Sequence, residues 1–212
     1  DKAGLGQILA TLAGEINREP VNAAMERIDG EFVITPEETG LEINQPQLLE
    51  EFMNAIESRQ NADINIPVEV TEPEFTEKAF KDSTQLIGSF YTSIAGSEAG
   101  RNKNLDTASG KINDYVVYPD EIFSTNWCFG EMTPDNGYRM APFIVGGELT
   151  NGMGGGVCQV SSTLYMALLY AEVEIVERQN HSQKVGYADY GFDSTLAGDY
   201  IDLKFKNDTG HP

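Results

Sequence analysis

Residues 152–170 read Gly-Met-Gly-Gly-Gly-Val-Cys-Gln-Val-Ser-Ser-Thr-Leu-Tyr-Met-Ala-Leu-Leu-Tyr, so a glycine run leads directly into an apolar helical pattern. Glycine tolerates positive φ and has no Cβ, which lets the backbone turn tightly and approach a neighbouring segment. The pattern predicts a helix that begins near Cys158 and ends near Ala171. Unpaired N–H groups and the positive end of the helix dipole gather at such a helix start, and both favour a thiolate at Cys158.

Helical spacing divides the side chains of this segment between two faces. The first face, at i, i+3, i+4 and i+7, carries Cys158, Ser161, Ser162 and Tyr165. The second face carries Val160, Leu164, Ala167 and Leu168. We expect the second face to be core, and the semi-polar first face to line a cleft.

A nucleophilic thiol needs a base and usually a third group that orients the base. His181 follows a predicted strand, and Asp193 lies 12 residues later, just before another. If they converge with Cys158, His181 would take the thiol proton and Asp193 would fix the imidazole tautomer. The order of the three residues is that of papain-like and transglutaminase-like hydrolases, which is an analogy of order alone.

Further residues are candidates for holding an oxyanion or the substrate. The backbone N–H groups of Val157–Gln159, next to Gly156, and the Gln159 side chain are candidates for oxyanion binding. Ser161 and Ser162 are candidates because they share the face of the cysteine. Arg101 and Asn104 lie one helical turn apart, and a guanidinium suits a substrate carboxylate.

Each of these residues also has a structural interpretation. Cys158 is equally compatible with a buried inert thiol or with a disulfide to Cys128. His181 is compatible with a loop hydrogen bond, Asp193 with a turn, and Arg101 with a buried structural pair that includes Asn104. The loop aromatics are candidates either for stacking on a sugar or for plugging the edge of a core: Trp127, Tyr138 and Phe143.

The periodicities predict an α+β protein of two small domains, 1–75 and 76–212, the second with a mostly antiparallel sheet and the helix that begins at the glycine–cysteine motif. In the first domain we expect helices at 5–18 and 48–56, the latter capped by Asn44 with Pro46 in its first turn, a hairpin at 31–43, a strand at 64–70 and a linker at 71–75. In the second we expect strands at 85–92, 115–118, 143–145, 173–178 and 200–206, a helix at 101–109, and loops elsewhere in 124–156.

Composition excludes several classes of function. The formal charge of −20 argues against nucleic acid as a partner, since binding phosphates requires a basic surface. Two cysteines and two histidines, without a Cys-x-x-Cys pair, predict no metal site, and the glycine run lacks the Gly-Lys-Ser/Thr of a phosphate loop, so we expect no cofactor. No apolar run approaches the roughly 20 residues that span a bilayer. The chain begins at Asp1 rather than Met, so we expect any membrane anchor to lie upstream.

Several segments resemble the VanW family over roughly residues 84–209. The resemblance rests on Glu121-Ile-Phe-Ser-Thr-Asn126, Gly137-Tyr138, Ala141-Pro142, Gly154-Gly-Gly-Val-Cys-Gln-Val-Ser-Ser-Thr-Leu-Tyr165, Arg101, Asn104, Asn180-His-Ser182 and Asp193. Residues 5–70 are similar to the peptidoglycan-binding module that often precedes such domains. Cys128 departs from the family pattern, and the resemblance implies that further residues follow Pro212.

The resemblance implies an extracytoplasmic protein associated with the cell wall, commonly of Gram-positive cells, with peptidoglycan or another wall polymer as its partner. It supplies no settled reaction. The residues favour a cysteine-dependent amidase or transpeptidase that acts on peptidoglycan peptides, and the alternatives are a non-catalytic wall-binding module and a structural ectodomain with a Cys128–Cys158 bond.

Overall fold

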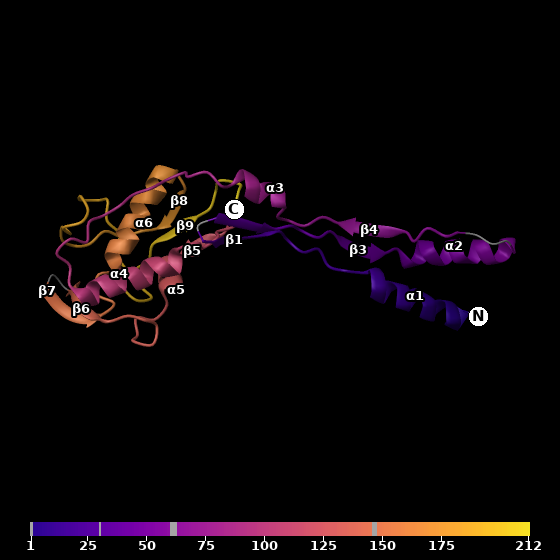
Figure 1. The fold of residues 1–212 in the computed structure, drawn as a ribbon, viewed down its shortest axis with the longest axis horizontal. Coiled ribbons are helices and arrows are strands. Elements are labelled where there is room, and N and C mark those ends of the chain that lie inside the picture. Colours follow the sequence, from indigo (N-terminus) through magenta and orange to yellow (C-terminus); the bar gives the residue numbers. More distant parts are fainter. Residues whose placement is uncertain (1, 30, 60–62, 146–147) are drawn as a thin grey trace. The chain divides into compact units, whose positions relative to one another are not determined.

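The computed structural model describes residues 2–29, 31–59, 63–145 and 148–212 (Figure 1). The chain divides into two compact units, residues 1–82 and 83–212. Both units combine helices with small antiparallel sheets, which confirms the predicted α+β class. Among the described helices, none has the length and apolar character needed to cross a membrane.

The first unit is built from three helices and two antiparallel strand pairs. Its elements are α1 (Lys2–Ile16), β1 (Ala24–Ile28), β2 (Glu31–Thr35), β3 (Gly40–Ile43), α2 (Gln45–Ser58), β4 (Val68–Thr71) and α3 (Glu77–Asp82). Strand β1 pairs with β2, and β3 pairs with β4. The hairpin predicted at 31–43 is therefore wrong: both of its strands form, but each pairs with a partner elsewhere in the chain.

Helix α2 begins as its sequence predicts. The Asn44 side chain accepts a hydrogen bond from the Gln47 amide at 3.1 Å, and Pro46 lies in the first turn. The helix buries Leu48 completely against Leu9 and Ile43, which form the core of this part of the unit. The expected linker at 71–75 lies inside the unit, because the Ala23 amide donates to the Phe75 carbonyl.

The second unit contains three helices, a three-stranded sheet and a hairpin. Its elements are α4 (Ala99–Ile112), β5 (Ile122–Ser124), α5 (Thr125–Phe129), β6 (Met140–Val145), β7 (Glu148–Met153), α6 (Val157–Ala171), β8 (Glu174–Glu177) and β9 (Lys204–Lys206). The sheet has the order β5-β9-β8 with antiparallel neighbours, and β6 pairs with β7. The mostly antiparallel sheet predicted for this unit is present.

Two apolar clusters meet along α6. Val157 and Val160 at its beginning pack against Ala108, Phe129 and Tyr138. Leu164 and Leu168 in its second half pack against Phe123 of β5, Phe205 of β9 and Leu203, which directly precedes β9. The apolar face predicted for this helix is therefore core, as expected.

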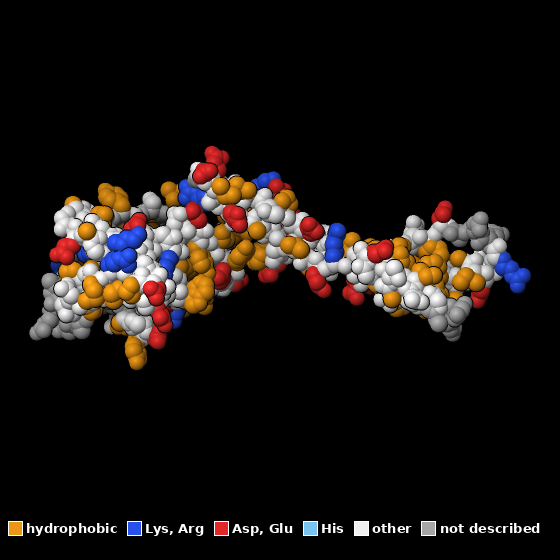
Figure 2. All heavy atoms as spheres, turned by 60° about the horizontal axis from the view of Figure 1, so that its bottom comes forward, with side chains coloured by type: hydrophobic (Ala, Val, Ile, Leu, Met, Phe, Trp, Pro, Cys, Tyr) orange, Lys and Arg blue, Asp and Glu red, His pale blue; other side chains and the backbone are white. Residues whose placement is uncertain are grey.

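Strands predicted at 85–92 and 115–118 are absent, because both segments have irregular backbone. The first is tied to α6 by side chains: Thr92 bonds Thr163 at 2.8 Å and accepts from Gln159 at 2.9 Å. Conversely, α5 and β7 form where loops were expected. On the face drawn in Figure 2, basic side chains form separate groups among acidic and apolar ones.

We expect Leu48→Ala to lower the free energy of unfolding by ~2–5 kcal/mol, because it leaves a cavity among fully buried neighbours. Urea unfolding followed by circular dichroism measures this change. Leu49→Ala is the matched control, since Leu49 is 41% exposed and Leu48 is 0% exposed. Equal effects of the two substitutions would contradict the packing described for α2.

Candidate functional site

The glycines before α6 permit a close approach that no other residue allows. Gly156 precedes the helix with φ +105°, in the left-handed region. A Cβ added at Gly155 would lie 2.4 Å from the carbonyl oxygen of Ala141 in β6. Helix α6 begins at Val157, so Cys158 occupies its first turn, as the sequence predicts.

The Cys158 sulfur lies under the segment 194–196. Its Sγ accepts a hydrogen bond from the Leu196 amide at 3.4 Å and lies 3.9 Å from Thr195 Oγ1. The imidazole of His181 lies close enough to the sulfur for each group to shift the pKa of the other. The thiol is therefore partly buried between the start of a helix, an amide donor and a ring nitrogen.

Asp193 holds His181 through two hydrogen bonds to one carboxylate oxygen. Oδ2 lies 2.7 Å from the His181 amide nitrogen and 2.5 Å from Nδ1 of its ring. This engages Nδ1 and leaves Nε2 as the ring nitrogen for Cys158. The structure thus brings Cys158, His181 and Asp193 together as one series, in which Asp193 bonds His181 and His181 acts on the pKa of Cys158.

The three groups change one another's pKa. Burial by itself raises the pKa of Cys158, but hydrogen bonds from His181 and the Leu196 amide lower it below the usual thiol value. Burial lowers the pKa of His181, but bonds to Cys158 and Asp193 raise it above its usual value. Burial raises the pKa of Asp193, and the His181 bonds lower it overall. These directions favour a thiolate beside an imidazolium.

Ser161 and Ser162 are buried, so the semi-polar face of α6 does not line an open cleft. Ser161 Oγ donates to Ser194 Oγ at 3.1 Å. Ser162 Oγ accepts from the Ser194 amide at 2.9 Å and lies 2.7 Å from the Cys158 carbonyl oxygen. Both serines fasten the 194–196 segment onto the helix, instead of facing solvent as the sequence suggested.

Gln159 is also engaged within the chain. Its Oε1 accepts from Arg101 Nη2 at 2.7 Å, and its Nε2 donates to Thr92 Oγ1 and to the Ser93 carbonyl. Its backbone amide donates to the Gly156 carbonyl, and that of Val157 donates to Gly154. Of the three amides predicted as oxyanion donors, that of Cys158 alone has no acceptor among the described residues.

Asn104 is a structural clamp, while Arg101 keeps free donors. Asn104 Nδ2 donates to the carbonyls of Arg139 and Gly155, and Oδ1 accepts from the Arg139 amide at 2.7 Å. With 0% exposure, Asn104 does not reach a substrate in this structure. Arg101 bonds Gln159 and Ser97 and has no acidic partner in the part of the chain that the structure describes.

Cys128 and Cys158 are both free thiols, so the disulfide alternative is wrong for this structure. The Cys128 thiol donates to the Lys111 carbonyl at 3.3 Å. Burial raises the pKa of Cys128, the opposite direction from that of Cys158. The two cysteines therefore lie in chemically different environments.

The three loop aromatics have different fates. Tyr138 is fully buried and donates its hydroxyl to the Phe129 carbonyl at 3.0 Å, so its sugar-stacking role is wrong. Phe143 covers Gly152 in the β6–β7 hairpin, where an added Cβ would lie 2.2 Å from its ring. Trp127 is 72% exposed and packs edge-on against Tyr115.

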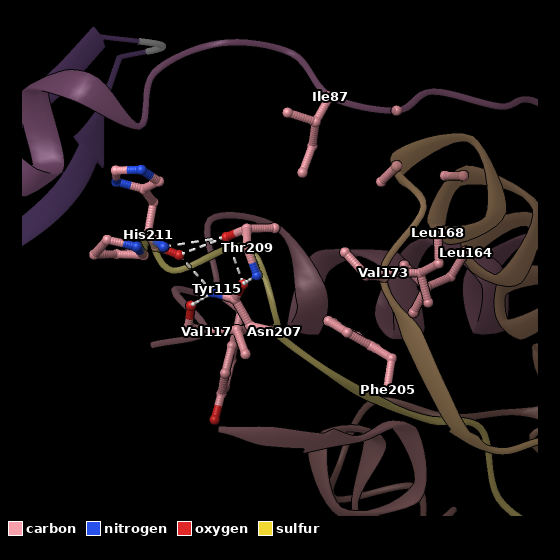
Figure 3. A pocket seen from close by; sticks show the side chains of 14 residues that line it. Ile87, Tyr115, Val117, Leu164, Leu168, Val173, Phe205, Asn207, Thr209 and His211 are labelled. Carbon is pink, nitrogen blue, oxygen red and sulfur yellow. Dashed lines mark hydrogen bonds between the residues drawn. The ribbon is translucent and has the colours of Figure 1, made fainter. Parts of the chain in front are cut away.

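A cavity of about 300 Å³ lies beside the second half of α6 (Figure 3). Leu164, Leu168, Val173 and Phe205 line it, and Asn207, Thr209 and His211 form a hydrogen-bonded group at its other side. None of Cys158, His181 and Asp193 lines this cavity. Over residues 2–29, 31–59, 63–145 and 148–212, no group of three His, Cys, Asp or Glu side chains is arranged to hold a metal ion.

Sequence reasoning missed Tyr187 and the Thr195–Leu196 backbone. The Tyr187 ring lies edge-on to His181, with ring centroids 6.4 Å apart. Burial and the charge of Cys158 raise the pKa of the phenol, while a hydrogen bond to Ser162 lowers it. No local pattern marks these positions, because they reach Cys158 only through the fold.

Fold and site together define an α+β protein that holds a cysteine beside a histidine, which is hydrogen-bonded to an aspartate. Residues 100–212 match the family described as "VanW like protein", and residues 1–65 match the one described as "Putative peptidoglycan binding domain". The chain therefore belongs to the VanW-like family, as its sequence motifs predict.

Two curated relatives support this membership. The chain is 33% identical over 207 residues to the "Uncharacterized protein YoaR" of Bacillus subtilis, which covers 97% of this chain and 67% of that protein. It is 32% identical over 111 residues to the "Vancomycin B-type resistance protein VanW" of Enterococcus faecalis, over 50% of this chain and 40% of that protein. No solved structure matches the chain.

We expect the two cysteines to ionise at different pH values. Alkylation of Cys158 should reach half its maximal rate below the pH of about 8.5 typical of a free thiol, and alkylation of Cys128 above it. Iodoacetamide labelling across a pH series, with mass spectrometry of each cysteine peptide, measures both values in one sample. In His181→Ala the Cys158 midpoint should rise, because burial then acts without its opposing hydrogen bond. Indistinguishable midpoints in the wild type would contradict the site geometry.

Asn104→Ala should lower the free energy of unfolding by ~2–4 kcal/mol, since buried backbone groups of Arg139 and Gly155 lose their partners. Chemical denaturation measures the change. Asn102→Ala is the control, because the side-chain Nδ2 of Asn102 makes one long bond of 3.4 Å to the Ser97 carbonyl. Its Oδ1 has no partner among the described residues. If Asn104→Ala lowers the free energy of unfolding no more than Asn102→Ala does, Asn104 is not a structural clamp.

Proposed function

We propose that the second unit is a cysteine-dependent acyl-transfer enzyme, an amidase or a transpeptidase, that acts on peptide amides of the cell wall outside the cytoplasm. The observation that carries the proposal is the position of His181, which bonds Asp193 on one side and lowers the pKa of Cys158 on the other. An inert buried thiol needs neither a base nor a group that orients the base.

In the proposed reaction the Cys158 proton passes to Nε2 of His181. The thiolate then attacks the carbonyl carbon of an amide, and the carbonyl electron pair moves to oxygen. The amide N–H of Cys158 and the positive end of the α6 dipole favour this oxyanion. Collapse of the tetrahedral intermediate breaks the C–N bond, and His181 protonates the leaving amine.

This step leaves a thioester on Cys158. Water or an amine then attacks the thioester carbonyl, His181 accepts its proton, and the thiolate departs and is regenerated. Water yields hydrolysis, and an amine yields transpeptidation. Asp193 keeps Nδ1 protonated throughout, so Nε2 remains the atom that exchanges protons.

Arg101 favours a substrate that carries a carboxylate, which its guanidinium would bind. It lies beside the start of α6, where its side chain packs against Gly156 and bonds Gln159. Two of its five N–H donors have partners, and the chain as a whole carries 34 acidic against 14 basic side chains. A guanidinium without a carboxylate partner in such an acidic chain suits the free carboxyl group of a wall peptide.

The first unit is proposed to bind the wall polymer, supported by the family that residues 1–65 match. Under this proposal it brings the second unit to its substrate. A purely non-catalytic wall-binding protein is the competing function, and the experiment below separates the two.

Treatment of purified sacculi with the wild-type protein should change the muropeptide profile, and Cys158→Ala should leave the profile as in untreated sacculi. Mass spectrometry of the digested sacculi measures the change. Cys128→Ala is the matched control and should retain the wild-type effect, because Cys128 lies outside the His181 series.

The proposed chemistry fails if wild type and Cys158→Ala yield the same profile while both pellet with sacculi. That outcome would favour the non-catalytic binding function. Arg101→Gln should change the muropeptide profile less than the wild type does, because the contact to the substrate carboxylate is lost. The bond that is cut should stay the same.

A further inference from the structure

Arg178 follows β8 and contacts the loop that carries Asp193. Its Nε donates to the Asp193 carbonyl at 2.7 Å, and its Nη2 donates to the Gly191 carbonyl at 2.7 Å. Beside these bonds, the Thr195 amide donates to the Gln179 carbonyl at 2.8 Å. The end of β8 and the Asp193 segment are therefore joined by both side-chain and backbone bonds.

The same guanidinium also faces the Asp193 carboxylate. Nη2 lies 3.6 Å from Oδ1, while Oδ2 receives both His181 bonds. The Asp193 side chain is 6% exposed and that of Arg178 is 18% exposed, so solvent screens the pair only partly. Each carboxylate oxygen thus has its own partner, and this arrangement sets the rotation of the carboxylate about its last bond.

The position of Arg178 is itself constrained by α6. Its guanidinium carbon lies 4.8 Å from the centre of the Tyr165 ring, a cation–π geometry. Tyr165 lies on the same helical face as Cys158, two turns further on. Arg178 consequently links the position of the Asp193 carboxylate to the helix that carries the thiol.

We propose that Arg178 is a positioning residue, the fourth member of the series, which holds Asp193 so that the His181 ring stays directed at Cys158. The proposal deepens the proposed function and rests on it for its biological purpose. Its physical content, the ionisation of Cys158, is measured without any substrate.

The groups that surround Cys158, His181 and Asp193 determine how a substitution of Arg178 can change the pKa of Cys158. Cys158 is faced by His181, Tyr187, Thr195 and the Leu196 amide. Asp193 is faced by His181 and Arg178, and Arg101 from α4 acts on Tyr187. Arg178 is the sole guanidinium paired with a carboxylate of the series among the described residues, so its removal should reach the thiol through Asp193 and His181.

The test is the pH dependence of Cys158 alkylation in Arg178→Gln. Without the guanidinium, the Asp193 carboxylate loses the contact that fixes its rotation. The His181 ring is then held less firmly toward the sulfur, so the imidazolium stabilises the thiolate less and the thiol pKa rises. We expect the Cys158 midpoint to rise by about one pH unit, which lowers its alkylation rate near neutral pH about tenfold. Cys128 in the same sample is the internal reference and should keep its midpoint.

Arg139→Gln is the matched control, because Arg139 is an exposed arginine that donates to the Pro134 and Tyr138 carbonyls, outside the series. It should leave Cys158 unchanged. Arg178→Lys should raise the Cys158 midpoint by less than Arg178→Gln does, since lysine keeps the positive charge but lacks the planar guanidinium with its several N–H donors. Millimolar guanidinium should restore the rate in Arg178→Ala by filling the vacated space.

A wild-type Cys158 midpoint in Arg178→Gln, at an unchanged near-ultraviolet circular dichroism spectrum, overturns the proposal. If Arg178→Gln does not fold, Arg178→Lys decides: a Cys158 midpoint equal to that of the wild type also overturns it. Failure of the proposed function is a separate result, since an unchanged muropeptide profile leaves the alkylation shift in place.

Discussion

The site in the second unit depends on the hydroxyl of Ser162, which hydrogen-bonds the irregular segment 194–196 to helix α6. Its oxygen accepts from the Ser194 amide, lies 3.2 Å from the Ser194 carbonyl oxygen and 2.7 Å from the Cys158 carbonyl oxygen. The segment so held supplies Asp193 on one side and the Leu196 amide on the other, and both act on the thiol. Since buried hydrogen bonds in a low dielectric are costly to leave unmade, this attachment allows little freedom at the site.

Helix α6 has two separate environments along its length. Its first turn carries the thiol, with glycines that admit the neighbouring hairpin to within contact distance of the backbone. Its second half borders an apolar cavity that contains no member of the Cys158 series. This cavity is thus distinct from the thiol, and the proposed chemistry depends on hydrogen bonding rather than on this hollow.

Patterns local in the sequence predicted local structure well. The start of α6 followed from the glycine run, the start of α2 followed from Asn44 and Pro46, and the apolar face of α6 proved to be core. The predicted pairing of strands failed in the first unit, because the partner of a strand is set by the fold and not by its own pattern. There β2 and β3 were expected to pair with each other, but β2 pairs with β1 and β3 with β4. The segment 85–92 was predicted to be a strand, but its bonds go to side chains of α6.

By itself, the sequence determined the family and the α+β class, because both depend on residue types in a local order, and it marked Cys158, His181 and Asp193 as candidates. Only the fold brought these three residues together. The tertiary structure alone decided that Ser161, Ser162, Gln159 and Asn104 hydrogen-bond to other parts of the chain, and that Cys128 is not bonded to Cys158. It also brought Arg178, Tyr187 and the Leu196 amide to the series. The physical reason is that the partner of a polar group is chosen by the folded chain's geometry, and no spacing along the sequence records that choice.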